Sequence, residues 1–222
     1  MSLFNEQDLK AIREMLAPSL KRPVQLVLFI SDQNCAYCEP TRELLEALSM
    51  LHDSLSLTVY DLQIDTGQSV ALGVDKAPGI VVLGGAEGQD YGIRFYGIPS
   101  GYEFASLLEA IRIVGSDEVE LQTATRQFLE GLTAPLHLQV FVTPSCPYCP
   151  RAVVLAHRLA YASPHVTADA VEVTEFPDLG DRYHVMGVPR TVIDEVVHVE
   201  GAVPEGMLLA KLIAAQQEGV TL

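Results

Sequence analysis

The sequence predicts an α/β protein made of two tandem units, each with a mixed central sheet flanked by helices. The four cysteines form two Cys-x-x-Cys pairs, and Cys35 lies 111 positions before Cys146. Pro78 also lies 111 positions before Pro189, so 43 positions separate the first cysteine from this proline in each half. The same alternation of strand-like and helix-like segments surrounds both sets of landmarks. Such agreement indicates an internal repeat.

Each unit is expected to begin with a helix and then a strand that leads to the cysteine pair. The predicted helices cover residues 5–17 and roughly 117–131. The strands are the apolar, β-branched stretches VQLVLFI at 24–30 and LHLQVFV at 136–142. A helical pattern follows each pair, TRELLEALSML in the first half and RAVVLAHRLAYA in the second.

The second part of each unit is predicted to contain three more strands and a closing helix. An apolar strand comes first, then a strand headed by the repeated proline (PGIVVL; PRTVID), then a turn into the last strand. The early strand–helix–strand order implies a parallel pair, and the later hairpin adds antiparallel strands. Gly115 is expected to end one helix, and Ser116 or Asp117 to cap the next. We therefore expect domains at 1–115 and 116–222.

Composition excludes several classes of partner. The net charge is −15, from 14 basic and 29 acidic residues, which argues against a nucleic-acid surface and against docking on anionic lipid. No stretch reaches the roughly 18 apolar residues of a membrane span, and the N-terminal sequence does not resemble a secretory signal. We therefore expect a cytoplasmic protein. In that compartment paired cysteines favour redox chemistry or metal binding over structural disulfides.

Each cysteine pair falls between the end of a predicted strand and the start of a predicted helix. The positive end of the helix dipole and its free N–H groups favour a thiolate, so the thiol pKa of the first cysteine should be lowered. Because the thiolate is the nucleophile, Cys35 and Cys146 are the expected attacking residues. Cys38 and Cys149, one turn further along, are the expected resolving residues.

The cysteines allow three other interpretations. A structural disulfide within Cys-x-x-Cys closes too small a loop to remove much entropy from the unfolded chain. A zinc site formed by both pairs is disfavoured, because typical pairs are about 15–20 residues apart, whereas Cys38 and Cys146 are 108 positions apart. We therefore expect no metal site. The possibility that the N-terminal pair is an inert product of duplication stays open.

The repeated proline is expected to complete each site. Its fixed distance from the cysteines predicts that Ala77–Pro78 and Val188–Pro189 are cis peptide bonds, which are rare and usually conformationally important. Such bonds would turn the backbone of Ala77 and Val188 outward beside the thiols. A substrate chain could then pair with that backbone as an added strand.

These residues resemble a known family. The order of strand, Cys-x-x-Cys, helix, strand and x-Pro before a hairpin is similar to the thioredoxin fold, and CPYC at 146–149 is similar to the glutaredoxin active site. Two such units in one chain resemble the protein disulfide oxidoreductases of archaea and thermophilic bacteria. The resemblance implies dithiol–disulfide exchange on protein substrates, no bound cofactor, and electrons supplied by a thioredoxin reductase. The implied site residues are Cys35, Cys38 and Pro78 with Cys146, Cys149 and Pro189.

The sequence departs from thioredoxins proper in one respect. Thioredoxins place a buried Asp, which relays protons, six residues before the first cysteine, and Phe29 and Val140 occupy these positions here. The resemblance therefore leaves the proton acceptor of the resolving step unassigned.

The two pairs are not expected to be equivalent. Glu39 directly follows Cys38, whereas Arg151 lies near Cys149 and no acidic residue lies within five positions of Cys146. Negative charge disfavours a thiolate and positive charge favours it, so the C-terminal pair should be the more reactive and oxidising. Three alternatives remain: a reductant domain for a peroxidase, a glutathione-dependent glutaredoxin, and a non-catalytic interaction module.

Overall fold

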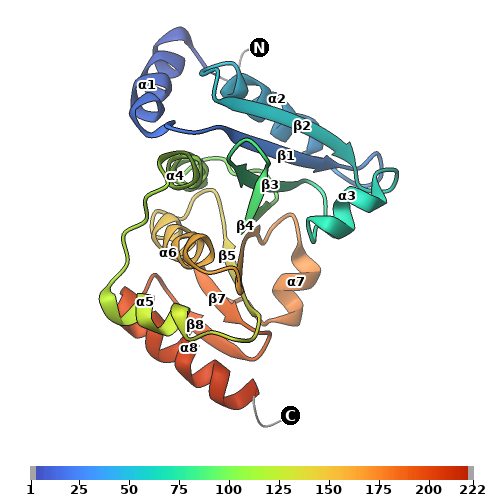
Figure 1. Cartoon of the computed structure of the whole chain (residues 1–222). Helices are drawn as coiled ribbons and strands as arrows, with labels where there is room; N and C mark the ends of the chain where they lie inside the picture. The colour runs from blue at the N-terminus through green and yellow to red at the C-terminus, as the bar shows by residue number, and fades with distance from the viewer. Residues whose placement is uncertain (1–3, 220–222) are drawn as a thin grey trace.

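The structure, a computed structural model, describes residues 4–219. One mixed sheet of eight strands runs through the molecule in the order β2-β1-β3-β4-β6-β5-β7-β8, and helices cover both of its faces (Figure 1). Within the described residues, no helix has the length and apolar character needed to cross a bilayer.

The first unit forms one half of this sheet. β1 pairs parallel with β2 and antiparallel with β3, and β3 pairs antiparallel with β4. The elements, in chain order, are α1 (Glu6–Leu16), the 3-10 helix η1 (Ala17–Ser19), β1 (Val24–Ile30), α2 (Cys38–Ser49), β2 (Leu55–Asp61), α3 (Thr66–Ala71), β3 (Gly79–Gly84), β4 (Gln89–Tyr96) and α4 (Glu103–Ser116).

The second unit repeats this arrangement. β5 pairs parallel with β6 and antiparallel with β7, and β7 pairs antiparallel with β8. The predicted fold class, two tandem α/β units with mixed sheets flanked by helices, is confirmed. The elements are α5 (Thr123–Glu130), β5 (Leu136–Val142), α6 (Cys149–Ala162), β6 (Val166–Glu172), α7 (Pro177–Arg182), β7 (Arg190–Ile193), β8 (Val197–Glu200) and α8 (Glu205–Gly219).

The segment between the two units differs from the sequence prediction. The second unit's first helix begins at Thr123 rather than near residue 117, and Gln122, not Ser116 or Asp117, precedes it. Asp117 instead adopts a left-handed conformation (φ 62°) at the end of α4. Its carboxylate pairs with Arg22 at 3.0 Å, so it is engaged elsewhere and caps no following helix. The domain boundary between residues 115 and 116 stays a prediction.

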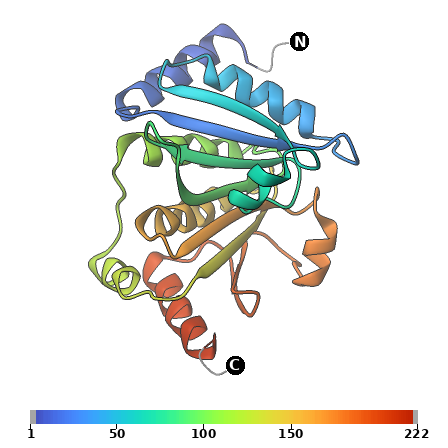
Figure 2. The ribbon, with the colours of Figure 1, turned by 45° about the vertical axis from the view of Figure 1, so that its right-hand side comes forward.

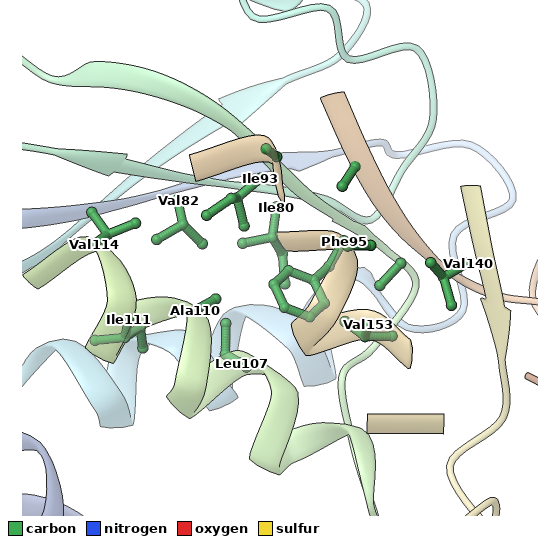
Figure 3. Close-up of a cluster of buried hydrophobic side chains, with 14 of the residues drawn as sticks. Ile80, Val82, Ile93, Phe95, Leu107, Ala110, Ile111, Val114, Val140 and Val153 are labelled. Atoms are coloured by element: carbon green, nitrogen blue, oxygen red, sulfur yellow. The ribbon is translucent and has the colours of Figure 1, made fainter. Parts of the chain in front are cut away.

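The two faces of the sheet carry separate hydrophobic cores. The larger core lies under α1, α2, α4, α6 and α8. Figure 3 shows its centre, where side chains of β3 and β4 such as Ile80 and Phe95 meet Leu107 and Ile111 of α4 and Val153 of α6. The smaller core lies on the other face, beneath the two short helices α3 and α7, which the sequence did not predict (Figure 1).

The two units are joined by the pairing of β4 with β6, which we call the seam. These strands run parallel, with Ile93 opposite Ala168 and Tyr96 opposite Val171. Figure 2 shows the resulting continuous sheet, which the sequence did not predict. His157 of α6 closes the seam from the larger core: its ring meets Phe95 edge-on at 4.8 Å.

His157 is held neutral at the seam. Its Nε2–H donates to the carbonyl oxygen of Arg94 at 3.3 Å, an assignment of the tautomer that follows from the acceptor. Burial lowers the pKa of His157 to about 4. Between pH 4 and pH 6.5, His157 therefore binds a proton in the unfolded chain but not in the folded chain. This contribution to stability is present above pH 6.5 and is lost as the pH falls towards 4.

Replacement of Gly92 by alanine should weaken the seam. Gly92 has φ +73°, and a Cβ built on it lies 2.5 Å from the carbonyl oxygen of Val166 on β6. We expect Gly92→Ala to lower the free energy of unfolding by about 2 kcal/mol or more, because it combines a left-handed backbone with a backbone clash. Urea denaturation measures this.

Gly67→Ala is the matched control. Nothing lies within 4 Å of a Cβ at Gly67, which is in helix α3, so that change should be neutral or stabilising by up to about 1 kcal/mol. Equal effects of the two substitutions would contradict the role given to the seam.

Candidate redox site

Both cysteine pairs lie at the same edge of the sheet, which we call the redox edge. β1, β4, β6 and β5 all run in one direction, so their carboxyl ends coincide. Cys35 follows β1 and Cys146 follows β5, with β3, β4 and β6 between those strands. Four strand spacings amount to about 19 Å. One metal ion therefore cannot be held by all four sulfurs.

Each pair lies at a helix N-terminus, as the sequence predicts. The second cysteine is the first residue of its helix, Cys38 in α2 and Cys149 in α6. Each pair forms a disulfide, Cys35–Cys38 and Cys146–Cys149. Pro150 lies in the first turn of α6, where a missing N–H costs no helical hydrogen bond.

The Cys146 sulfur lies between a backbone donor and a backbone carbonyl. The Cys149 N–H donates to Cys146 Sγ at 3.1 Å, and the carbonyl oxygen of Val188 lies 3.7 Å from the same sulfur. The Val188–Pro189 bond is cis, as predicted. In the disulfide the sulfur has no hydrogen, so its contact with the carbonyl is a close approach. In the dithiol form, the N–H favours a thiolate at Cys146.

The first pair has related but different contacts. Ala77–Pro78 is also cis, as predicted. The carbonyl oxygen of Pro78 accepts from Gly97 N–H at 2.9 Å, as that of Pro189 does from Gly201 at 2.8 Å. At this site, however, a backbone N–H reaches the second sulfur: Ser31 N–H donates to Cys38 Sγ at 3.4 Å.

Exposure also differs between the first and the second cysteine of each pair. Cys149 is fully buried and Cys146 is 8% exposed, whereas Cys35 is partly exposed and Cys38 is 7% exposed. In both pairs the first sulfur is therefore more accessible than the second. This difference in accessibility suits attack by the first cysteine on an incoming disulfide, followed by attack of the more buried second cysteine on the sulfur of the first.

Sequence reasoning missed the buried carboxyl groups beside the end of β5, the strand that leads to the second pair. Glu103, from the first unit, lies at the start of α4, beside Tyr102, whose N–H donates to the carbonyl oxygen of Pro144 at 2.9 Å. The Glu103 side chain shares a small pocket with Val142, the last residue of β5, and with Glu172. The contact between α4 and the loop that contains Pro144 could not be inferred from the spacing of residues in the sequence, because it depends on the pairing of β4 with β6.

Burial changes the protonation of these carboxyl groups. Burial raises the pKa of Glu103 to about 7, and a 2.8 Å hydrogen bond from the Ser106 hydroxyl partly offsets the rise. Burial likewise raises the pKa of Glu175 to about 7, with a further contribution from the charge of Glu172. Glu175 accepts the Ile98 N–H at 2.7 Å and so joins the two units. At the positions of the thioredoxin Asp, Phe29 and Val140 are buried and apolar.

Comparison with protein-family models matches part of the chain. A model described as "Thioredoxin domain" matches residues 136–214, within the second unit. Among curated proteins, a component of the alkyl hydroperoxide reductase of Pseudomonas aeruginosa is 26% identical over 207 residues. The match covers 93% of this chain and 37% of that protein, so the chain spans little more than a third of the length of this relative.

Solved structures match the whole arrangement. A protein disulfide oxidoreductase from Aeropyrum pernix is 32% identical with a TM-score of 0.89, and the match covers 96% of this chain and 94% of that one. The NTD_N/C domain of the alkyl hydroperoxide reductase from Enterococcus faecalis is 27% identical with a TM-score of 0.85, over 94% of this chain and 99% of that one.

The contacts of the two pairs predict different reactivity in the dithiol state. We expect iodoacetamide to alkylate Cys146 several-fold faster than Cys35 at pH 7, because a backbone N–H reaches the Cys146 sulfur and no acidic residue is adjacent in sequence. Reduced Cys35→Ser/Cys38→Ser and Cys146→Ser/Cys149→Ser proteins allow the two rates to be measured separately. If access dominated, the more exposed Cys35 would react faster, which would contradict the prediction.

Proposed function

The chain belongs to the protein disulfide oxidoreductase family of two tandem thioredoxin-like units, and from this premise we propose that it carries out dithiol–disulfide exchange on protein substrates. The observation that carries the proposal is the position of Cys146, at a helix N-terminus and 3.7 Å from the Val188 carbonyl. The proposed site residues are Cys146, Cys149, Val188 and Pro189, with the corresponding set of the first unit in Cys35, Cys38, Ala77 and Pro78.

In the reductive direction, the Cys146 thiolate attacks one sulfur of a substrate disulfide. A mixed disulfide forms and the other substrate sulfur leaves as a thiolate, which takes up a proton. Cys149 then loses its proton and attacks Cys146 Sγ, which releases the second substrate thiolate and leaves Cys146–Cys149 oxidised. The same steps in reverse transfer a disulfide to a substrate dithiol. No cofactor takes part, because the electrons remain on sulfur.

The resolving step needs a proton acceptor for the buried Cys149. We assign this role to Glu103, whose pKa of about 7 suits proton exchange near neutral pH. One of its oxygens, Oε2, accepts from Ser106, while Oε1 has no hydrogen-bond partner among the described residues. A carboxyl group from the first unit then serves the cysteines of the second. This replaces the relay that thioredoxins place at the positions of Phe29 and Val140.

The proposed setting is the cytoplasm, with a thioredoxin reductase as the electron donor. The acidic composition, with a net charge of −15, supports neither a nucleic-acid nor a membrane partner. The first pair exchanges electrons with the second or serves other substrates along the same edge. Three strands lie between β1 and β5, so the two pairs do not exchange directly within one molecule, and any transfer between them passes through a substrate or a second molecule.

A second candidate function is that of a reductant domain for a peroxidase. The relatives named as components of alkyl hydroperoxide reductase, which match over nearly the whole chain, favour it. The first pair distinguishes the two functions. A reductant domain that works through one pair loses nothing when Cys35 and Cys38 become serine, whereas an oxidoreductase with two working pairs loses part of its turnover.

Insulin reduction by dithiothreitol tests the proposed exchange. We expect Cys146→Ser to abolish most catalysed turnover, because the mixed disulfide cannot form, and Cys35→Ser to remove a smaller part. Ser145→Ala, an exposed neighbour of the nucleophile, is the control and should retain activity. Wild-type turnover no faster than the dithiothreitol background would show that the chain is a non-catalytic module, and full activity of Cys146→Ser would show that the second pair is not the working site. A requirement for glutathione would indicate a glutaredoxin.

The pH dependence of the resolving step tests Glu103. We expect the single-turnover rate to rise with pH through about 7 as Glu103 ionises. In Glu103→Gln this inflection should disappear and the rate should fall by about tenfold or more. Glu175→Gln is the matched control: its pKa is also about 7, but its carboxylate holds the Ile98 N–H, so the inflection should persist. An unchanged profile in Glu103→Gln would refute the assignment.

A further inference from the structure

A polar cavity lies on the face of the sheet that carries α3 and α7, away from the cysteine-bearing helices. It has a volume of about 290 Å³ and spans the seam, so both units line it. His137, the second residue of β5, forms part of its wall and lies at the opposite end of that strand from Cys146. The side chains used below are Asp75, Lys76, Arg94, Tyr96, His137 and Asp169. We call this the junction cavity.

The first unit contributes a buried guanidinium group. Arg94 is 7% exposed. Its Nε and Nη2 donate to the Leu72 carbonyl oxygen at 2.9 and 2.6 Å, and Nη2 also donates to Asp90 Oδ2 at 2.8 Å. Its Nη1 is buried and has no hydrogen-bond partner within the described part of the chain. One strong donor of a residue that lines the cavity is therefore uncommitted.

The second unit contributes a buried carboxylate. Asp169 is 5% exposed, and its Oδ2 lies 2.7 Å from His137 Nε2. Burial alone would lower the pKa of His137, but the hydrogen bond and charge of Asp169 outweigh burial and raise it. The other oxygen, Oδ1, is buried and has no partner among residues 4–219. The wall thus also holds an uncommitted acceptor.

These two groups are adjacent across the seam. Arg94 and Asp169 are register partners on β4 and β6, and neighbouring strands lie about 4.8 Å apart. They nevertheless form no direct ion pair, since Arg94 pairs with Asp90 instead. A group held between these two residues would satisfy both unpartnered atoms if it accepted from Arg94 Nη1 and donated to Asp169 Oδ1.

The charged side chains that line the junction cavity indicate which kind of ligand it would bind. The first unit supplies Arg94 and Lys76; the Lys76 ammonium pairs with Asp75 and lies 4.3 Å from the centre of the Tyr96 ring. The second unit supplies Asp169. We propose that the junction cavity binds a free α-amino acid, whose carboxylate accepts from Arg94 and whose ammonium group donates to Asp169. Pro135 and Leu136, which line the same cavity, supply apolar contacts for its side chain.

This inference is independent of the proposed exchange reaction, because it uses no cysteine and no group at the redox edge. It is tested by isothermal titration calorimetry on the full chain with L-leucine at pH 7. N-Acetyl-L-leucine, which lacks the ammonium group, and L-leucinamide, which lacks the carboxylate, are the matched probes. We expect L-leucine to bind and each blocked analogue to bind at least about tenfold more weakly, because one buried charge then has no partner.

Variants locate the binding. Asp169→Asn keeps the size of the side chain but removes the carboxylate, and should weaken L-leucine binding at least about tenfold. Lys76→Gln changes the rim, where the side chain is 23% exposed, so it leaves the buried seam intact and should also weaken binding. Asp53→Asn, an equal charge change at an exposed turn, is the control and should bind normally. Thermal unfolding establishes that each variant is folded.

Three results would overturn the proposal. These are no binding of L-leucine at about 10 mM, equal binding of the blocked analogues, and unchanged binding in folded Asp169→Asn and Lys76→Gln. The first of these would indicate that a single bridging water satisfies both buried atoms.

Discussion

The pairing of β4 with β6 is the constraint on which the rest of the structure depends. Because the two strands run parallel, the four strands β1, β4, β6 and β5 share one direction, and both disulfides meet the solvent at one edge. The same pairing brings Glu103 of the first unit beside the loop before Cys146. On the opposite face it sets Arg94 next to Asp169. An antiparallel seam would have placed the disulfides at opposite edges and removed both relationships.

β4 and β6 can pair closely because residues of the two strands are small, buried or conformationally permissive. Ala168 and Ala170 of β6 let the α6 side chains reach β4, and Gly92 allows a backbone approach that a Cβ would block. His157 completes the packing as a neutral imidazole that satisfies the Arg94 carbonyl. A protonated imidazole there would bury an unpaired charge in the larger core, which is why burial lowers its pKa.

Sequence spacing predicted the features that repeat, and it failed where the two units contact each other. Two cysteine pairs and two prolines in register were sufficient for the order of the strands and longer helices, the helix-terminal sulfurs and both cis bonds; the short helices α3 and α7 were missed. The continuous sheet, Glu103 and the Arg94–Asp169 wall each arise from contacts between units, and no local pattern encodes such contacts. The start of α5 was predicted wrongly because Asp117, a good capping residue in isolation, is drawn into an ion pair with Arg22. Local propensity was overridden by a tertiary contact.

The burial of Glu103 connects the stability of the fold with the chemistry proposed at its edge. The folded-state pKa of Glu103 is raised to about 7, so the stability that its neutral form provides is complete below pH 4.5 and is lost as the pH rises through 7. A proton acceptor, however, must be ionised. The group therefore works in the protonation state that its surroundings disfavour, and this makes the carboxylate a stronger base towards a buried thiol than an exposed one. His157 shows the opposite behaviour: it stabilises the fold as the pH rises from 4 to 6.5. Near neutral pH, neutral His157 makes its full contribution to the stability of the fold. In the same pH range Glu103 ionises and becomes available as a proton acceptor.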